Sequence, residues 1–203
     1  MTTELTVPSY AKLNWYLRVL DPRPDGYHDL ETIFETLELA DTLRFAPLDK
    51  DECLISGFPP DVPAERNLIT RAWQLLRDEC PGRIRGLYVE ADKTLPRGGG
   101  LGGGSSNAAA ALLALDRLYG LSLSTERLVE LGARLGSDVA FFVMGGCAVA
   151  TGRGEILTPL EAPGEFHLVM VLPDEPVPTG EAYARLDAIP RPAPAVTLAE
   201  AAE

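Results

Sequence analysis

Apolar and polar residues alternate with a period of two through the first quarter of the chain, as is typical of β-strands whose two faces have different surroundings. The alternation covers Lys12–Leu20, Tyr27–Leu39 and Thr42–Pro47. Turn-forming sequence, Asp21–Gly26, separates the first two stretches. We therefore predict a β-hairpin or meander for this part of the chain.

Further along, the apolar spacing changes to that of helices. We expect helices over Asn67–Cys80 and Thr125–Leu135, and over Ala108–Tyr119 with Ser105 or Ser106 as its N-cap. The other expected elements are strands at Ile84–Ala91, Cys147–Thr151, Glu155–Leu160 and Phe166–Leu172 and a short helix at Gly180–Asp187. Strands and helices mix without a strict β-α-β rhythm, which favours an α+β fold over a doubly wound one.

A glycine-rich segment, Leu95–Asn107 (LPRGGGLGGGSSN), has six glycines in the seven positions Gly98–Gly104 and leads directly into a predicted helix. Glycine is needed where the backbone takes a positive φ or approaches another group closely. Such a loop before a helix directs several N–H donors and the positive end of the helix dipole at one place, which indicates a phosphate site. The alternative is a flexible linker, but linkers are not normally placed between a strand and a capped helix.

Two common nucleotide-binding signatures do not fit this loop. Gly98, Gly100 and Gly103 satisfy G-x-G-x-x-G formally, but Asp92–Arg97 separates them from the preceding strand. A Walker A loop needs a lysine after its last glycine, where this chain has Ser105. A Rossmann oxidoreductase is therefore only a distant alternative.

Composition and charge limit the kinds of partner that the chain can be expected to bind. The 203 residues include 18 Lys and Arg against 30 Asp and Glu, and the net charge of −12 argues against nucleic acid or an anionic membrane as partner. Cys53, Cys80 and Cys147 form no C-x-x-C pair, and no second His or Cys stands near His28 at ligand spacing, so we expect no metal cluster.

No apolar stretch reaches the ~20 residues of a membrane span, and Met1–Tyr10 lacks the pattern of a signal or transit peptide. The expected location is the cytoplasm of a bacterium.

The segment Pro96–Ala109 resembles the phosphate-binding loop of the GHMP kinases, the superfamily of galactokinase, homoserine kinase and mevalonate kinase. Further segments match, in order and spacing, the branch that acts on a cytidine diphosphate-linked methylerythritol: Ala11–Asn14, Arg23–Thr32, Arg66–Leu68, Leu135–Phe142 and Gly152–Leu157. The resemblance implies a two-domain α+β GHMP kinase fold. Residues 1–158 would form an N-terminal domain like ribosomal protein S5 domain 2, and residues 159–203 the beginning of a ferredoxin-like domain.

The activity that the resemblance implies is ATP-dependent phosphorylation of the 2-hydroxyl of this small-molecule substrate, in isoprenoid precursor synthesis, with Mg²⁺ bridging the phosphates. Phosphoryl transfer to an alcohol needs a carboxylate near the hydroxyl and positive charge beside it. By resemblance, Asp138 is the base or orienting group and Lys12 polarises the hydroxyl. Taken alone, Asp138 is an ordinary acidic residue in the first turn of a helix, and Lys12 a surface-facing strand residue.

The resemblance also implies a nucleotide site. Asn67 would lie near the adenine, although it can equally be a helix N-cap, and Lys93 would add charge beside the loop. Ser106 is by analogy a contact to Mg²⁺. The loop residues expected to bind ATP are Pro96, Gly98, Gly99, Gly100, Leu101, Gly102, Gly103, Gly104, Ser105 and Ser106.

For the second substrate, Asn14 lies two residues after Lys12 on the same strand face and is expected to bind the sugar alcohol. By resemblance, Tyr27 and His28 belong to a cytidine pocket. Thr179 and Tyr183 lie in a segment that places an aromatic ring on the other face of the cytosine, although Tyr183 can equally pack in a core.

Departures from the family pattern leave alternatives open. Arg97 replaces a usual apolar residue, Ala140 replaces a usual proline, and the family's third glycine-rich motif has no counterpart in this sequence. Another GHMP kinase, of the homoserine or mevalonate type, and a catalytically silent nucleotide-binding module are the alternatives. The sequence does not predict the oligomeric state.

Overall fold

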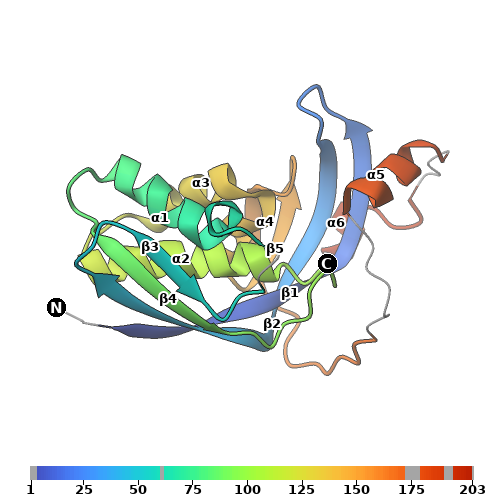
Figure 1. The fold of residues 1–203 in the computed structure, drawn as a ribbon. Helices are drawn as coiled ribbons and strands as arrows, with labels where there is room; N and C mark the ends of the chain where they lie inside the picture. The colour runs from blue at the N-terminus through green and yellow to red at the C-terminus, as the bar shows by residue number, and fades with distance from the viewer. Residues whose placement is uncertain (1–3, 60–61, 172–178, 190–193, 203) are drawn as a thin grey trace.

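The protein is described by a computed structural model over residues 4–59, 62–171, 179–189 and 194–202. Figure 1 shows one face of a β-sheet covered by helices. The strands of this sheet are β1 (Leu5–Pro22), β2 (His28–Leu48), β3 (Cys53–Ser56), β4 (Gly86–Asp92), β5 (Cys147–Thr151) and β6 (Ile156–Leu160). The helices are a 3₁₀ turn (Ala64–Arg66), α1 (Leu68–Glu79), α2 (Gly103–Tyr119), α3 (Thr125–Leu135), α4 (Ser137–Met144), α5 (Thr179–Asp187) and α6 (Leu198–Ala201).

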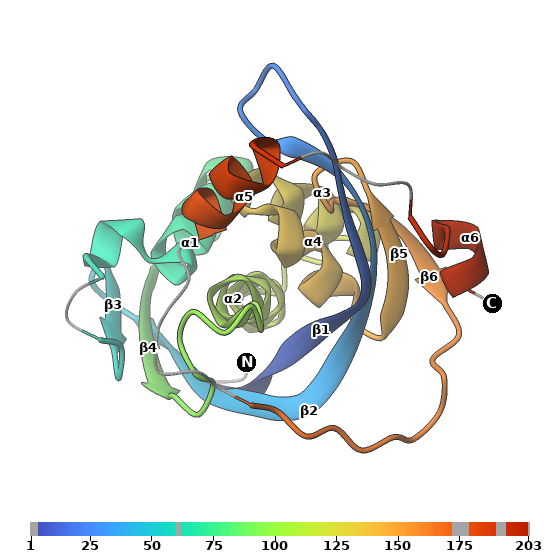
Figure 2. The ribbon, with the colours of Figure 1, turned by 90° about the vertical axis from the view of Figure 1, so that its right-hand side faces the viewer.

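The long strand β2 organises the sheet. On one edge it pairs antiparallel with β1; on the other it pairs antiparallel with β4 through residues 42–48 and with β5 through residues 32–35. The outer strands are β3, parallel to β4, and β6, antiparallel to β5. Figure 2 looks along α2 and shows β1, β2 and β5 curving around it. The fold therefore brings the middle of β1 close to the N-termini of α2 and α4.

Alanine side chains let α2 approach the sheet. Residues 108–111 are all alanine and all buried, and Leu112 and Leu115 have no exposed surface. They pack against Leu43, Phe45 and Val89 of the sheet in one core cluster. Because a small side chain shortens the distance between helix axis and sheet, the alanine run fixes where the N-terminus of α2 lies.

The predicted elements agree with the structure in part. The helix at Thr125–Leu135 and the strand at Cys147–Thr151 have the predicted bounds, and the α+β class is confirmed. β1 is longer than the predicted Lys12–Leu20, and β2 joins the two stretches predicted at Tyr27–Leu39 and Thr42–Pro47 into one strand. The predicted strand at Phe166–Leu172 is wrong for residues 166–171, which have no regular structure, and Leu172 lies outside the described residues. This segment pairs with no strand in the described chain, and a strand needs such a partner to satisfy its backbone.

The expected division after residue 158 falls inside β6, which pairs with β5 up to Leu160. The described residues beyond Leu160 form α5 and α6 and contain no strand. The two-domain division and the ferredoxin-like character of residues 159–203 therefore stay predictions. None of the helices in the described part of the chain is long and apolar enough to cross a membrane.

Candidate active site at the glycine-rich loop

The glycine-rich loop takes backbone conformations that side chains disfavour. Gly98, Gly100 and Gly102 have φ values of 72°, 71° and 72°. Gly102 is the N-cap of α2, and neither a side-chain cap nor an acidic residue occupies the first turn. The first N–H groups of an α-helix have no acceptor within the helix, so here they are available to an anion.

The prediction that Ser105 or Ser106 caps this helix is wrong. The helix begins at Gly103, five residues before Ala108, because Gly102 adopts the left-handed conformation without cost and starts the helix itself. Ser106 is 3% exposed, and its hydroxyl accepts a hydrogen bond from Ser9 at 2.8 Å. The serine side chains therefore leave the helix N-terminus open.

The loop is attached to β1 and α4. The Lys12 backbone N–H donates to the Leu101 carbonyl at 3.1 Å. A Cβ at Gly102 would lie 2.6 Å from Phe142 Cε2 and 3.3 Å from Lys12 Cγ, so only glycine fits between them. This close approach places the loop beside both residues of the predicted catalytic pair.

Lys12 and Asp138 meet, although 126 positions separate them in the sequence. Lys12 Nζ lies 3.7 Å from Asp138 Oδ2 and donates a hydrogen bond of 2.7 Å to Asn14 Oδ1. The Lys12 side chain is 8% exposed and that of Asp138 is 32% exposed. Burial lowers the pKa of Lys12 because it removes water from the ammonium group, and the nearby Asp138 carboxylate opposes that shift. The buried lysine thus faces a carboxylate that is partly exposed.

Asn14 is held in place by a residue that the sequence did not single out. Its amide nitrogen donates to Thr32 Oγ1 at 2.7 Å, and the Thr32 hydroxyl donates to the Tyr16 carbonyl at 2.6 Å. Thr32 has no exposed surface. A threonine in an alternating strand gave no sequence signal for this role.

Among the predicted cytidine-pocket residues, His28 and Tyr183 lie side by side. His28 Nε2 lies 2.9 Å from Asp187 Oδ1, and the His28 and Tyr183 rings are 5.1 Å apart. Burial raises the pKa of Tyr183, and the negative charge of Asp138 raises it further. Tyr27 is 53% exposed, with the Arg153 guanidinium over its ring.

Other predicted residues have partners within the protein. Asn67 is the N-cap of α1 and accepts from the Ile69 N–H at 3.0 Å, as the simpler interpretation predicts. Lys93 forms an ion pair with the buried Asp41. The Thr179 side chain lies outside the described residues. Contacts of these residues with ligands stay predictions.

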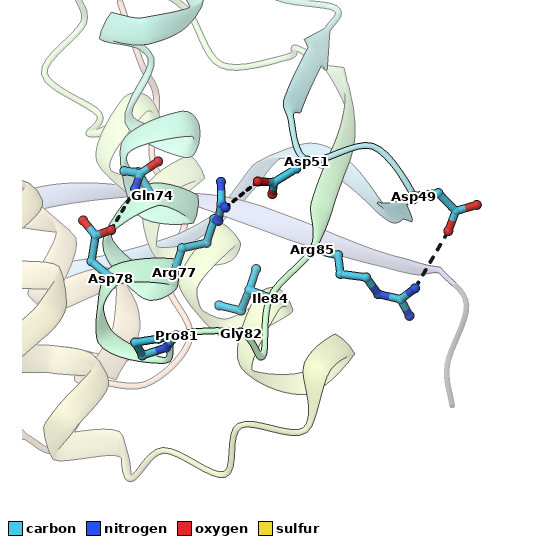
Figure 3. A pocket seen from close by; sticks show the side chains of 9 residues that line it. All are labelled: Asp49, Asp51, Gln74, Arg77, Asp78, Pro81, Gly82, Ile84 and Arg85. Atoms are coloured by element: carbon cyan, nitrogen blue, oxygen red, sulfur yellow. Dashed lines mark hydrogen bonds and ion pairs between the residues drawn. The ribbon is translucent and has the colours of Figure 1, made fainter.

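A cavity of about 460 Å³ lies at the far end of β4, away from the loop (Figure 3). Its two arginines are already paired, Arg77 with Asp51 at 2.7 Å and Arg85 with Asp49 at 3.8 Å. The glycine-rich loop follows the opposite end of the same strand. The cavity is therefore separate from the phosphate-binding geometry.

The fold is that of a GHMP kinase: residues 67–146 match the family model described as the GHMP kinases N terminal domain. A homoserine kinase from Cytophaga hutchinsonii shares the fold, with a TM-score of 0.63 at 18% identity over 92% of this chain and 65% of that one. A solved 4-(cytidine 5'-diphospho)-2C-methyl-D-erythritol kinase is 40% identical, with a TM-score of 0.65 over 77% of this chain and 55% of that one. The chain belongs to the family of 4-diphosphocytidyl-2-C-methyl-D-erythritol kinases.

Proteins with that family name from two bacteria give the extent of the match. The protein from Methylococcus capsulatus is 48% identical over 83% of this chain and 58% of its own length. The protein from Marinobacter nauticus is 40% identical over 100% of this chain and 70% of its own length. The chain thus spans less than two thirds of the length of several of the relatives it matches, between 58% and 61% for three of them.

Proposed function

We propose that the chain transfers the γ-phosphoryl group of ATP to the 2-hydroxyl of 4-diphosphocytidyl-2-C-methyl-D-erythritol. The observation that supports this most is the approach of Lys12 Nζ to Asp138 Oδ2, 3.7 Å, beside the loop that leads into α2. Phosphoryl transfer to an alcohol needs little from a protein beyond positioning and charge stabilisation, and this geometry offers both.

In this proposal the triphosphate lies against the N-terminus of α2. The N–H groups of the loop and of the first turn donate to its oxygens, and the helix dipole favours its negative charge. The loop residues from Pro96 to Ser106 form this cradle, with Lys93 at its stem. Asn67 lies at the start of α1, whose Leu68 side chain reaches to 4.0 Å from the Cβ position of Gly104, so an adenine beside Asn67 is consistent with phosphates at α2.

The acceptor hydroxyl is placed between Lys12 and Asp138. As its oxygen attacks the γ-phosphorus, the bond from that phosphorus to the departing ADP oxygen breaks. Asp138 orients the hydroxyl and takes its proton, while the Lys12 ammonium stabilises the negative charge that develops on the oxygen. Asn14 fixes the Lys12 side chain through their 2.7 Å hydrogen bond and presents its amide to the sugar alcohol.

Mg²⁺ accompanies ATP in this proposal and, when bound, neutralises phosphate charge. In the described residues, no group of three His, Cys, Asp or Glu side chains could hold a metal ion. Ser106 does not fit as a ligand in this arrangement, because its hydroxyl is buried against Ser9. The triphosphate and water would therefore supply the metal's ligands, as is common for Mg²⁺.

The cytidine end of the substrate is assigned to the side of the site that His28 and Tyr183 line. Asp187 holds the His28 ring through its 2.9 Å contact, which leaves the other ring nitrogen to meet a base edge. Tyr183 offers an aromatic face for stacking, and Tyr27 and Thr179 complete the proposed pocket. The proposal also includes a boundary between two domains near residue 158 and a location in the bacterial cytoplasm.

A coupled assay of ADP release tests the proposal. The chain is incubated with ATP and Mg²⁺, with and without the cytidyl alcohol, and homoserine and mevalonate serve as control acceptors. We expect ADP release that depends on the cytidyl alcohol alone. Release with a control acceptor would favour another GHMP kinase. ATP binding without any product would favour a silent nucleotide-binding module.

A further inference from the structure

Asp41 is a buried carboxylate at the stem of the glycine-rich loop. It lies in β2 and has no exposed surface. Its Oδ1 accepts the N–H groups of Thr94 at 2.7 Å and Leu95 at 2.8 Å, and its Oδ2 pairs with Lys93 Nζ. A buried carboxylate is tolerated only when it is fully paired, so these three partners and Asp41 hold one another in place.

The same lysine is connected to the other end of the loop through Asn107. Because the amide oxygen and nitrogen of Asn107 satisfy their neighbours only in one orientation, we assign the oxygen to the side of Lys93. In this orientation the Asn107 oxygen accepts from Lys93 Nζ at 3.0 Å, and its nitrogen donates to the Gly103 carbonyl at 3.2 Å and to Ser9 Oγ at 2.8 Å. Gly103 and Asn107 belong to the first turns of α2. We call Asp41, Lys93, Asn107 and Ser9 the loop clamp, because together they join the loop's stem to the helix that follows it.

We propose that Asp41 and Lys93 are positioning residues, and that Lys93 serves nucleotide binding through the loop clamp rather than by contact with the phosphates. The proposal rests on the proposed function, because it assumes that the loop binds a nucleotide. The Asp41 carboxylate neutralises the Lys93 charge, so the pair attracts a triphosphate weakly. A loop of six glycines loses much backbone freedom when it becomes ordered, and fixing both of its ends reduces that loss on binding.

Nucleotide affinity distinguishes the two roles of Lys93. ATP binding is measured by titration calorimetry at several salt concentrations for the wild type, Lys93→Met, Asp41→Asn and the double variant. Lys50→Met is the matched control, since Lys50 is 85% exposed at its side chain and remote from the loop. We expect each single variant to lose at least about tenfold in affinity for ATP. The double variant should lose no more affinity than the single variant that binds ATP more weakly. The salt dependence should stay that of the wild type, because no phosphate contact is removed.

Amide hydrogen exchange tests the clamp without nucleotide. Hydrogen bonds to a carboxylate are roughly twice as strong as those to a neutral acceptor. Exchange at Thr94 and Leu95 should therefore become faster in Asp41→Asn, while the amides of α3 keep their rates. This measurement also reveals whether a variant has lost the fold as a whole, and the charge-neutral double variant serves where a single one does not fold.

The outcomes separate this inference from the proposed function. If the wild type binds ATP and both single variants keep its affinity, the loop clamp is overturned and the proposed function stands. If the losses add in the double variant and Lys93→Met has a shallower salt dependence, Lys93 contacts phosphate directly and the inference is wrong. If the wild type does not bind ATP, the proposed function fails, and unchanged exchange at Thr94 and Leu95 in Asp41→Asn overturns the clamp as well.

Discussion

Replacing Gly102 by alanine tests whether the loop, β1 and α4 approach one another as closely as described. Gly102 has a φ of +72°, and the new methyl group would lie 2.6 Å from Phe142 Cε2 and 3.3 Å from Lys12 Cγ. The left-handed conformation costs an L-residue about 1–2 kcal/mol, and inserting a methyl group into a packed contact costs about 1–3 kcal/mol more. We therefore expect Gly102→Ala to lower the free energy of unfolding by about 2–5 kcal/mol.

Gly100→Ala is the matched control. Gly100 has nearly the same φ, +71°, but a Cβ there meets nothing within 4 Å, so only the backbone cost of about 1–2 kcal/mol applies. Both variants are compared with the wild type by urea denaturation. Adding Phe142→Leu to Gly102→Ala should restore part of the difference, because it shortens the side chain that the methyl group meets. Equal losses in the two alanine variants, or no gain from Phe142→Leu, would show that the close contact is not present.

Three further predictions concern residues of the proposed site. Asp138→Asn should lower kcat about a hundredfold to ten-thousandfold with KM little changed, measured by initial rates of ADP release; wild-type kcat would remove Asp138 from the mechanism. Tyr183→Ala should weaken binding of the cytidyl substrate by about 1–3 kcal/mol in calorimetry while Tyr183→Phe keeps it, and equal affinities would exclude stacking. Burial lowers the pKa of Lys12 in the folded protein below the ordinary value of 10.5 that it has in the unfolded chain. Between these two pKa values the unfolded chain binds more protons at Lys12 than the folded protein does, so the free energy of unfolding rises with pH. Urea denaturation across this alkaline range should show that Lys12→Met loses this gain and Lys50→Met keeps it.

The sequence predicted those parts of the fold whose local signal agrees with their tertiary surroundings. The helix at Thr125–Leu135 has a side-chain cap at Ser124 and an amphipathic pattern, and its bounds are as predicted. The start of α2 was misplaced because serine is a frequent N-cap, whereas Gly102 takes that position through its φ of 72°. The segment Phe166–Val171 has strand-forming residues, but no strand in the described part of the chain pairs with it, so this preference has no effect.

The candidate site shows the same difference between residues that have a local sequence signal and residues that do not. Lys12, Asn14 and Asp138 could be named from the sequence, but the residues that support the site from behind, Thr32 and Asp41, could not. Asp41 falls in the short gap between the predicted strand stretches Tyr27–Leu39 and Thr42–Pro47. In the structure β2 continues through it, and a register shift in the β1–β2 pairing lies beside it. The available signal was a lone carboxylate within an otherwise strand-like pattern. Its partners, Lys93 and the N–H groups that follow, come from a distant segment and become visible only with the fold.

Local geometry explains how a chain with a net charge of −12 can be proposed to hold a triphosphate. Lys12 is paired with Asp138 and Lys93 with Asp41, so the lysines of the site add little net positive charge. The attraction must then come mainly from backbone N–H groups and the α2 dipole, which act at short range. Salt screens the distant acidic surface over about 8 Å at physiological ionic strength but affects these short contacts much less. Binding should consequently depend only weakly on salt, unlike phosphate binding by unpaired lysines and arginines.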